Sequence, residues 1–269
     1  ASGFDRSGKE PWEEVSPGDD SVFVGYKGLA GHFSIRRKRI EDSGIAVLLD
    51  KTPFYPESGG QTGDTGIIKG KDFTIKVVKT YKEGDAIVHA GTFTGGNRVS
   101  EPSVYAEVHE TIRHSAARNH TGTHLLHRAL NHILGSHVNQ TGSLVEPERL
   151  RFDFTHPEAV TREQIDTVEQ EVNKRVRMNL PVEAYETTLE EAKKDGAVAL
   201  FGEKYEDDVR VIKIGDYSME LCGGTHLRST GEIGCFRILK EEGVAAGVRR
   251  IEAVTGIAAE RIIREDKKL

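Results

Sequence analysis

The sequence predicts an α+β protein built in two parts, a small antiparallel β-barrel or sandwich followed by a domain that combines helices with strands. Three observations support this fold class. Residues 21–108 hold short β-prone runs separated by glycine and charged residues. Helical periodicity begins near residue 109, and β-prone runs return from residue 209 onward. We therefore expect one domain over residues 21–108 and a second over residues 109–256.

Short β-prone runs recur about every ten residues in the first part, a spacing typical of small all-β domains. They fall at residues 22–26, 32–40, 45–50, 73–81, 86–93 and 104–108. Polar and turn-forming residues fill the preceding segment, 1–20, which is expected to be a linker or a cut end.

Three helices are expected in the second part, each with a sequence signal at one end. Apolar residues recur at helical spacing over 111–134, and Gly135 suits the C-terminal cap. A capping-box pattern at Thr161 begins the second helix, and a short third helix is expected over 188–196. The second helix is expected to bury one apolar face: Ile165, Val168, Val172 and Val176.

Strands are expected again after these helices. They fall at residues 209–214, 217–221, 235–240 and 248–254. The final segment, 257–269, is charged and has helical propensity, so it is expected to start a C-terminal helical segment. Helices interleaved with strands favour an α+β arrangement for the second part.

Composition and charge exclude several classes of protein. With 36% hydrophobic and 30% charged residues, the 269-residue chain is typical of a globular protein rather than a disordered one. No apolar run approaches the roughly 18 residues of a membrane span, so no membrane association is expected. Two cysteines are too few for a disulfide framework, which favours a reducing, cytoplasmic compartment. The net charge of −6 means that nucleic-acid binding would need a local basic patch.

Two pairs of residues have the spacing of metal ligands. His120 and His124 are four positions apart in the predicted helix, so both project from one face within reach of one ion. Cys222 and His226 flank a Gly-Gly turn that allows their side chains to converge. Each pair alone is equally well explained by a solvated histidine face, or by a buried thiol with a surface histidine. Together, one thiolate and three imidazoles suit Zn²⁺, and we predict a zinc site.

Histidine is concentrated around the first pair, since seven of the eleven histidines lie in residues 109–137. The others in this window, including His127 and His132, are expected to be structural. No glutamate follows His120 directly, so the general base of His-Glu-x-x-His metalloproteases is missing. The base-deaminase signature, the Walker loop and the Gly-x-Ser-x-Gly elbow are also absent from the sequence.

A cluster of small polar residues spans positions 52–66. Four glycines there allow close backbone approach, and five side chains can make neutral hydrogen bonds: Thr52, Tyr55, Ser58, Gln61 and Thr62. The pattern fits either an ordinary hairpin connection or a pocket for a small polar substrate. Basic residues at 36–39, and Arg249 with Arg250, are either phosphate contacts or solvated strand faces.

These motifs resemble the editing region of alanyl-tRNA synthetases and the related free-standing alanyl editing proteins. The resemblance extends over about residues 21–256. It is carried by four segments: Thr52-Pro-Phe-Tyr-x-Glu-Ser-Gly-Gly-Gln61, His120-Thr-Gly-Thr-His124-Leu-Leu, Leu221-Cys-Gly-Gly-Thr-His226 and Val244-Ala-Ala-Gly-Val-Arg-Arg-Ile-Glu-Ala-Val-Thr-Gly256. Threonyl-tRNA synthetase editing domains share the paired metal ligands, but the flanking phrases here look alanyl. The last segment looks more like the synthetase than its free-standing relatives.

The resemblance implies a small antiparallel β-barrel followed by an α+β zinc-binding editing domain that hydrolyses mischarged Ser-tRNA(Ala) and Gly-tRNA(Ala). It implies as partners the acceptor end of tRNA(Ala) and, in a full-length protein, the rest of the synthetase. The polar start and charged end of the chain favour an excised editing fragment. The alternatives are a free-standing trans-editing protein, or a module that binds the tRNA acceptor end and uses zinc only structurally.

Within that function, each motif has an expected role. His120, His124, Cys222 and His226 are expected to hold Zn²⁺. Thr52 and Gln61 are the catalytic candidates, which read the serine hydroxyl or hold the attacking water, because a site built to pair with a hydroxyl rejects a substrate that lacks it. Arg249 and Arg250 are expected to contact tRNA phosphates.

Overall fold

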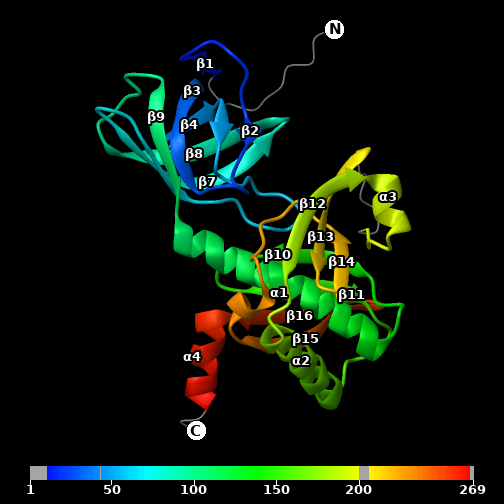
Figure 1. The fold of residues 1–269 in the computed structure, drawn as a ribbon. Coiled ribbons are helices and arrows are strands. Elements are labelled where there is room, and N and C mark those ends of the chain that lie inside the picture. Colours follow the sequence, from blue (N-terminus) through cyan, green and yellow to red (C-terminus); the bar gives the residue numbers. More distant parts are fainter. Residues whose placement is uncertain (1–10, 43, 200–205, 267–269) are drawn as a thin grey trace. The chain divides into compact units, whose positions relative to one another are not determined.

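The computed structural model describes residues 11–42, 44–199 and 206–266, and the chain divides into two compact units (Figure 1). Unit 1 holds the described residues of Ala1–Ser58 and Gly63–Ile112. Unit 2 holds Gly59–Thr62 and the described residues of Arg113–Leu269. Of the expected terminal segments, residues 1–10 and 267–269 lie outside the described residues.

Unit 1 is a closed antiparallel barrel of six strands, which decides between the barrel and the sandwich that the sequence allowed. Strand β9 pairs with β6 on one side and with β3 on the other, which closes the sheet. The order around the barrel is β3 (Ala30–Glu41), β4 (Gly44–Leu49), β8 (Ala86–Gly95), β7 (Thr74–Glu83), β6 (Gly66–Lys69) and β9 (Ser103–Val108).

Alternation along the barrel strands fills the interior with apolar side chains. In β7, Ile75 and Val77 are buried while Lys76 and Val78 are exposed, as the two-residue period of a strand requires. Phe54, which follows the barrel's short β5 (Lys51–Thr52), is fully buried in the same core. Three short strands complete the unit: β1 (Glu13–Glu14) on β3, and β2 (Val22–Phe23) parallel to β5.

The expected strand at 22–26 is shorter than predicted, because the chain turns after Phe23. The turn is closed by a hydrogen bond of 3.1 Å from Lys27 N to Val24 O. Strand β6 was not predicted at all. It has only four residues, Gly66–Lys69, and follows directly on the glycine-rich segment.

Unit 2 packs helices and two sheets around a main apolar core, with a smaller apolar cluster around Ala192, Val211 and Leu221. Helix α1 (Glu110–Leu134) confirms the helix expected at 111–134, and α2 (Arg162–Arg177) begins after Thr161. The main sheet has the order β10 (Gln140–Val145), β11 (Leu150–Thr155), β16 (Val248–Thr255) and β15 (Phe236–Ala245). Both helices contribute buried side chains to the core that these strands cover.

A second sheet has three strands, the last of which leads into the loop that holds Cys222 and His226. Its order is β12 (Val182–Thr188), β13 (Asp208–Ile214) and β14 (Ser218–Leu221). Short elements complete the fold: α3 (Leu189–Lys194), the 3-10 turn η1 (Thr230–Ile233) and α4 (Gly256–Asp266). The strands expected near 209, 217, 235 and 248 are all present. Strands β10, β11 and β12 were not predicted.

The sequence signals at the helix ends are confirmed. Thr161 accepts a hydrogen bond from Gln164 N, while Thr161 N donates to the Gln164 side chain, so the capping box is complete. At the start of α3, the Thr188 side chain accepts a hydrogen bond from Glu191 N. The expected apolar face of α2 is buried: Ile165, Val168, Val172 and Val176. Within the part of the chain that the structure describes, no helix combines the length and apolarity that crossing a bilayer requires.

Candidate metal centre

Two separate segments of unit 2 bring four potential ligands to one point. Helix α1 presents His120 and His124 one turn apart, and the loop after β14 presents Cys222 and His226. One ligand atom from each of the four side chains lies within 4.8 Å of all the others. The group could therefore hold a metal ion.

Arg210 and Gly224 determine how the loop after β14 passes helix α1. The Arg210 guanidinium donates to the carbonyls of Cys222, at 2.9 Å, and Gly224, at 2.8 Å. Gly224 lies directly against the His120 ring, so that a β-carbon at this position would overlap the imidazole. A glycine is therefore required where the loop passes His120.

The Nε2 atoms of His120 and His226 face the thiol of Cys222. Cys222 Sγ lies 3.4 Å from His120 Nε2 and 3.3 Å from His226 Nε2. Both ring nitrogens of His124 are buried, and neither forms a hydrogen bond of good geometry with the described residues, although Nδ1 lies 2.8 Å from Glu220 Oε2. A buried ring nitrogen without a partner is costly unless it is bound by something else, and a metal ion at this point would bind it. The donor set thus fits a metal.

Each imidazole has a different partner at its Nδ1 atom. Gln61 Oε1 lies 2.8 Å from His120 Nδ1, and Thr121 Oγ1 lies 3.2 Å from His226 Nδ1. Glu220 Oε2 lies 2.8 Å from His124 Nδ1, in an ion-pair contact. The Gln61 and Glu220 oxygens can only accept, so at His120 and His124 they favour the tautomer that leaves Nε2 as the electron-pair donor, whereas the Thr121 hydroxyl can either donate or accept.

The electrostatics of the cluster suit a cation. Burial opposes ionisation of Cys222, but the nearby His120 and His226 hold the pKa of its thiol well below the ordinary value. Burial and the charge of His120 lower the pKa of His226 to about 3, which leaves that ring neutral. At His124, burial is outweighed by Glu220 and Cys222, which raise its pKa to about 10. The negative field that favours a proton on His124 favours a divalent cation as well.

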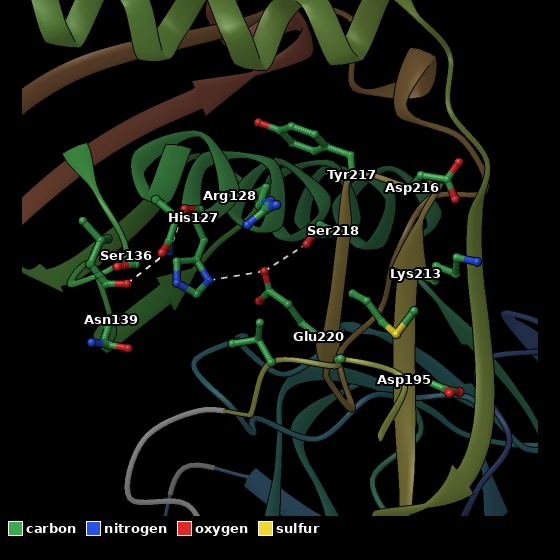
Figure 2. A pocket seen from close by; sticks show the side chains of 16 residues that line it. His127, Arg128, Ser136, Asn139, Asp195, Lys213, Asp216, Tyr217, Ser218 and Glu220 are labelled. Carbon is green, nitrogen blue, oxygen red and sulfur yellow. Dashed lines mark hydrogen bonds and ion pairs between the residues drawn. The ribbon is translucent and has the colours of Figure 1, made fainter. Parts of the chain in front are cut away.

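A cavity of about 550 Å³ lies on the other side of Glu220 (Figure 2). His127 Nδ1 lies 3.3 Å from Glu220 Oε1, and the Ser218 hydroxyl donates to the same oxygen at 3.1 Å. Figure 2 shows His127, Glu220 and Ser218 joined in this way along the cavity. One oxygen of the Glu220 carboxylate therefore contacts His124, and the other contacts His127 and Ser218, which line the cavity.

Gln61 belongs to unit 2, through the segment Gly59–Thr62, and is fully buried beside the cluster. Besides its contact with His120, Gln61 Oε1 accepts from Thr225 N at 2.9 Å. Its amide nitrogen donates to Thr225 Oγ1 at 2.9 Å. Both lone pairs of the amide oxygen are thus used within the site.

Thr52 belongs to unit 1, where it pairs with a buried histidine. His89 Nδ1 lies 3.0 Å from the carbonyl of Val47, so this nitrogen carries the proton. Burial lowers the pKa of His89 to about 4, which keeps the ring neutral. His89 Nε2 is then an acceptor, and the Thr52 hydroxyl donates to it at 2.7 Å. Thr52 Oγ1 also accepts from Phe54 N, and its remaining lone pair can only accept.

The arginine pair expected to contact phosphate is held by carboxylates. Arg249 forms two hydrogen bonds to Glu241, at 2.6 and 2.9 Å. Arg250 forms two to Asp153, at 2.7 and 2.8 Å. In each case Nε and one terminal nitrogen form these bonds, and the other terminal nitrogen takes no part in them.

The basic residues at 36–39 are likewise paired within unit 1. Arg39 is almost fully buried between Glu83 and the Trp12 ring. That side chain therefore belongs to the barrel's own packing.

Of the residues that surround the four potential ligands, Gln61 was predicted from the sequence and three others were not. Glu220, Thr121 and His127 were not proposed for the site. A signal was present for Glu220, because it is the one charged residue in the short strand Ser218–Leu221 and precedes Cys222 by two positions. A buried carboxylate in that position needs a partner, and histidine supplies it.

Comparison with known proteins shows the family to which this chain is related. A family model described as "Threonyl and Alanyl tRNA synthetase second additional domain" matches residues 209–252. A second, described as "tRNA synthetases class II (A)", matches residues 25–112. The alanine–tRNA ligase of Pelotomaculum thermopropionicum is 50% identical over 268 residues, which is 96% of this chain. The chain belongs to the alanyl-tRNA synthetase family.

Other alanyl-tRNA synthetases match over a similar extent. That of Thermoanaerobacter sp. (strain X514) is 52% identical over 84% of this chain, and that of Idiomarina loihiensis is 46% identical over 96%. The chain spans only 26% to 31% of the length of these ligases. It is therefore a region of the synthetase. The matched segment 209–252 includes Cys222 and His226, whereas the histidines of α1 lie between the two matched segments.

Proposed function

We propose that this chain is the editing region of an alanyl-tRNA synthetase and hydrolyses the ester bond of mischarged Ser-tRNA(Ala) and Gly-tRNA(Ala). The observation that carries the proposal is the convergence of His120, His124, Cys222 and His226 in a chain of this family. The proposed partners are the acceptor end of tRNA(Ala) and the rest of the synthetase.

We propose Zn²⁺ as the metal, because one thiolate and three imidazoles are borderline-to-soft ligands that suit it. When bound, Zn²⁺ can polarise a carbonyl oxygen or lower the pKa of a water molecule. The chain's own contribution is to orient the imidazoles through Gln61, Thr121 and Glu220.

Thr52 is proposed to distinguish serine from alanine. Its proton is committed to His89, so its oxygen can accept a hydrogen bond from a serine hydroxyl but cannot donate one. Alanine offers no such donor, and a buried polar group left without its partner is unfavourable. Glycine lacks the hydroxyl too, so its removal must depend on another feature, such as space for the alanine methyl group.

Gln61 is proposed to support hydrolysis by holding His120 rather than by accepting a proton from water. Its amide oxygen already accepts from His120 and Thr225, so the remaining amide hydrogen is what it can offer to a water or carbonyl.

A second candidate function has one observation in its favour. Four protein ligands are typical of structural zinc, whereas catalytic zinc keeps an open position. On this alternative, the region binds the tRNA acceptor end and the metal only stabilises the fold.

Single-turnover deacylation by the purified chain separates the two candidates. We expect the chain to hydrolyse Ser-tRNA(Ala) and to spare Ala-tRNA(Ala). Tight binding of tRNA(Ala) without deacylation would support the binding module instead. Faster hydrolysis of Ser-tRNA(Thr) than of Ser-tRNA(Ala) would indicate threonyl-type editing.

Variants at Thr52 and Gln61 test the roles proposed for them. Thr52→Val removes the hydroxyl at nearly constant volume, and we expect it to slow Ser-tRNA(Ala) hydrolysis about 10-fold or more, since a lost partner costs about 1–3 kcal/mol. Thr52→Ser keeps the hydroxyl and serves as the matched control. Unchanged hydrolysis and unchanged sparing of Ala-tRNA(Ala) in both Thr52→Val and Gln61→Ala would reject these roles.

A further inference from the structure

Among the described residues, Glu220 is the one carboxylate in contact with any of the four potential ligands, and it contacts His124. Its side chain is 5% exposed, and its oxygens have three partners. Oε2 contacts His124 Nδ1 at 2.8 Å, while Oε1 contacts His127 Nδ1 at 3.3 Å and the Ser218 hydroxyl at 3.1 Å. A buried carboxylate needs such partners, and here they fix its position.

The three imidazoles of the cluster are held unequally. His120 and His226 contact neutral oxygens, from Gln61 and Thr121. Only His124 contacts a charged oxygen. A carboxylate at the second nitrogen of an imidazole fixes its tautomer and strengthens it as a ligand more than a neutral acceptor does.

The charge balance of the site also favours a carboxylate beside His124. A divalent cation held by three neutral imidazoles and the Cys222 thiolate leaves one positive charge in a largely buried site. The Glu220 carboxylate, in contact with a ligand, supplies the second negative charge. The sum over cation, thiolate and carboxylate is then zero.

We propose that Glu220 is a positioning residue for a divalent metal ion, which fixes His124 with Nδ1 protonated and Nε2 on the metal and balances the charge of the site. The inference rests on the proposed metal function and deepens it. Glu220 does not bind the ion itself. It acts through His124.

Zinc affinity of the purified full chain is the primary test, measured by competition with a chromophoric chelator. Glu220→Gln keeps the size of the side chain and removes its charge, and we expect Zn²⁺ to bind 10- to 100-fold more weakly. Ser218→Ala is the matched control, because it removes a contact to Oε1 and leaves the oxygen at His124 in place. We expect its affinity to stay within about threefold of the unaltered chain.

Spectra of Co²⁺-loaded protein show whether the ligand set is preserved. In Glu220→Gln, the sulfur-to-cobalt absorption should persist at saturating Co²⁺, because the four ligands remain. Zn²⁺ affinity equal to that of the unaltered chain in a folded Glu220→Gln variant would overturn the proposal.

A measurement on the unaltered chain covers the case in which Glu220→Gln does not fold. Long-range ¹H–¹⁵N correlation of the Zn²⁺-loaded protein is expected to show His124 with a proton on Nδ1. A metal-bound Nδ1 at His124 would overturn the proposal. Failure of the unaltered chain to bind Zn²⁺ would overturn the metal function together with this inference, so the two failures are distinguishable.

Discussion

The imidazole of His120 occupies the space beside the α-carbon of Gly224, so closely that a β-carbon there would overlap the ring. The neighbouring Gly223 differs, because no heavy atom lies within 4 Å of the β-carbon position. A side chain is therefore excluded at Gly224 but has room at Gly223, although the two glycines are consecutive in one loop. The second of them controls where His120 can lie.

Substitution of Gly224 is expected to weaken metal binding, whereas substitution of Gly223 is expected to have little effect on it. Gly224→Ala should displace His120 from the cluster and weaken Zn²⁺ binding at least 10-fold, as expected for a misplaced ligand. Gly223→Ala should leave the affinity within about threefold. Chelator competition on both variants is the measurement. Equal affinities for the two would mean that the ligands do not require this close approach.

The two cysteines offer a matched pair for metal removal. Cys222 lies in the cluster, whereas Cys235 lies outside it, with its Sγ 3.9 Å from the carbonyl oxygen of Phe236. We expect Cys222→Ser to lose bound zinc and Cys235→Ser to keep it. Metal binding that is coupled to folding contributes on the order of 10 kcal/mol in small zinc domains. A chelator should therefore lower the melting temperature of Cys235→Ser and of the unaltered chain, and have little effect on Cys222→Ser. Calorimetry with and without chelator checks this, and an equal response from all three proteins would contradict it.

The local sequence patterns predicted much of this architecture, for physical reasons. Helical spacing and the capping box at Thr161 are local signals, and α1 and α2 follow them closely. The ligand pairs were predictable because each lies within five consecutive residues. Strand β12 was missed because most of its residues are exposed and its sequence, Val-Glu-Ala-Tyr-Glu-Thr-Thr, lacks an apolar stripe. Its backbone pairing with β13 determines its conformation.

The partners of the ligands could not be predicted in the same way, because they come from distant positions. Gln61 reaches His120 across 59 positions, and Thr121 reaches His226 across 105. No local pattern encodes such contacts. The alternation of Leu150, Phe152 and Phe154 in β11 was a usable strand signal, and it was overlooked between two helices.

Acid is expected to destabilise the barrel through His89. Burial lowers its pKa to about 4 in the folded chain, against about 6.5 for an unfolded histidine. Between these two values the unfolded state binds more protons, so the free energy of unfolding falls as the pH falls from 6.5 to 4. The total loss is about 3 kcal/mol. Urea unfolding over this pH range should show a smaller loss for His89→Gln, which cannot titrate. The same pH dependence in both proteins would contradict the assignment to His89.

Arg249 and Arg250 remain the predicted phosphate contacts. Each holds its carboxylate with Nε and one terminal nitrogen, and we predict that the other terminal nitrogen contacts phosphate. Replacing both by alanine is expected to reduce the slope of log affinity for tRNA(Ala) against log salt by about 1.4 to 1.8. Arg162→Ala, on the exposed face of α2, is the control and should leave the slope unchanged. An unaltered slope in the double variant would assign both arginines to the fold alone.

The wide separation of the four ligands along the chain has a consequence for folding. Cys222 and His120 are 102 positions apart, and the contact between Thr121 and His226 spans 105. Contacts of such high contact order form only after much of the intervening chain has been ordered, because closing long loops costs entropy. An ion that needs both segments is captured late. Under the proposed zinc function, metal content would report that α1 and the loop after β14 have come together, and a misassembled chain would be recognisable by its failure to retain zinc.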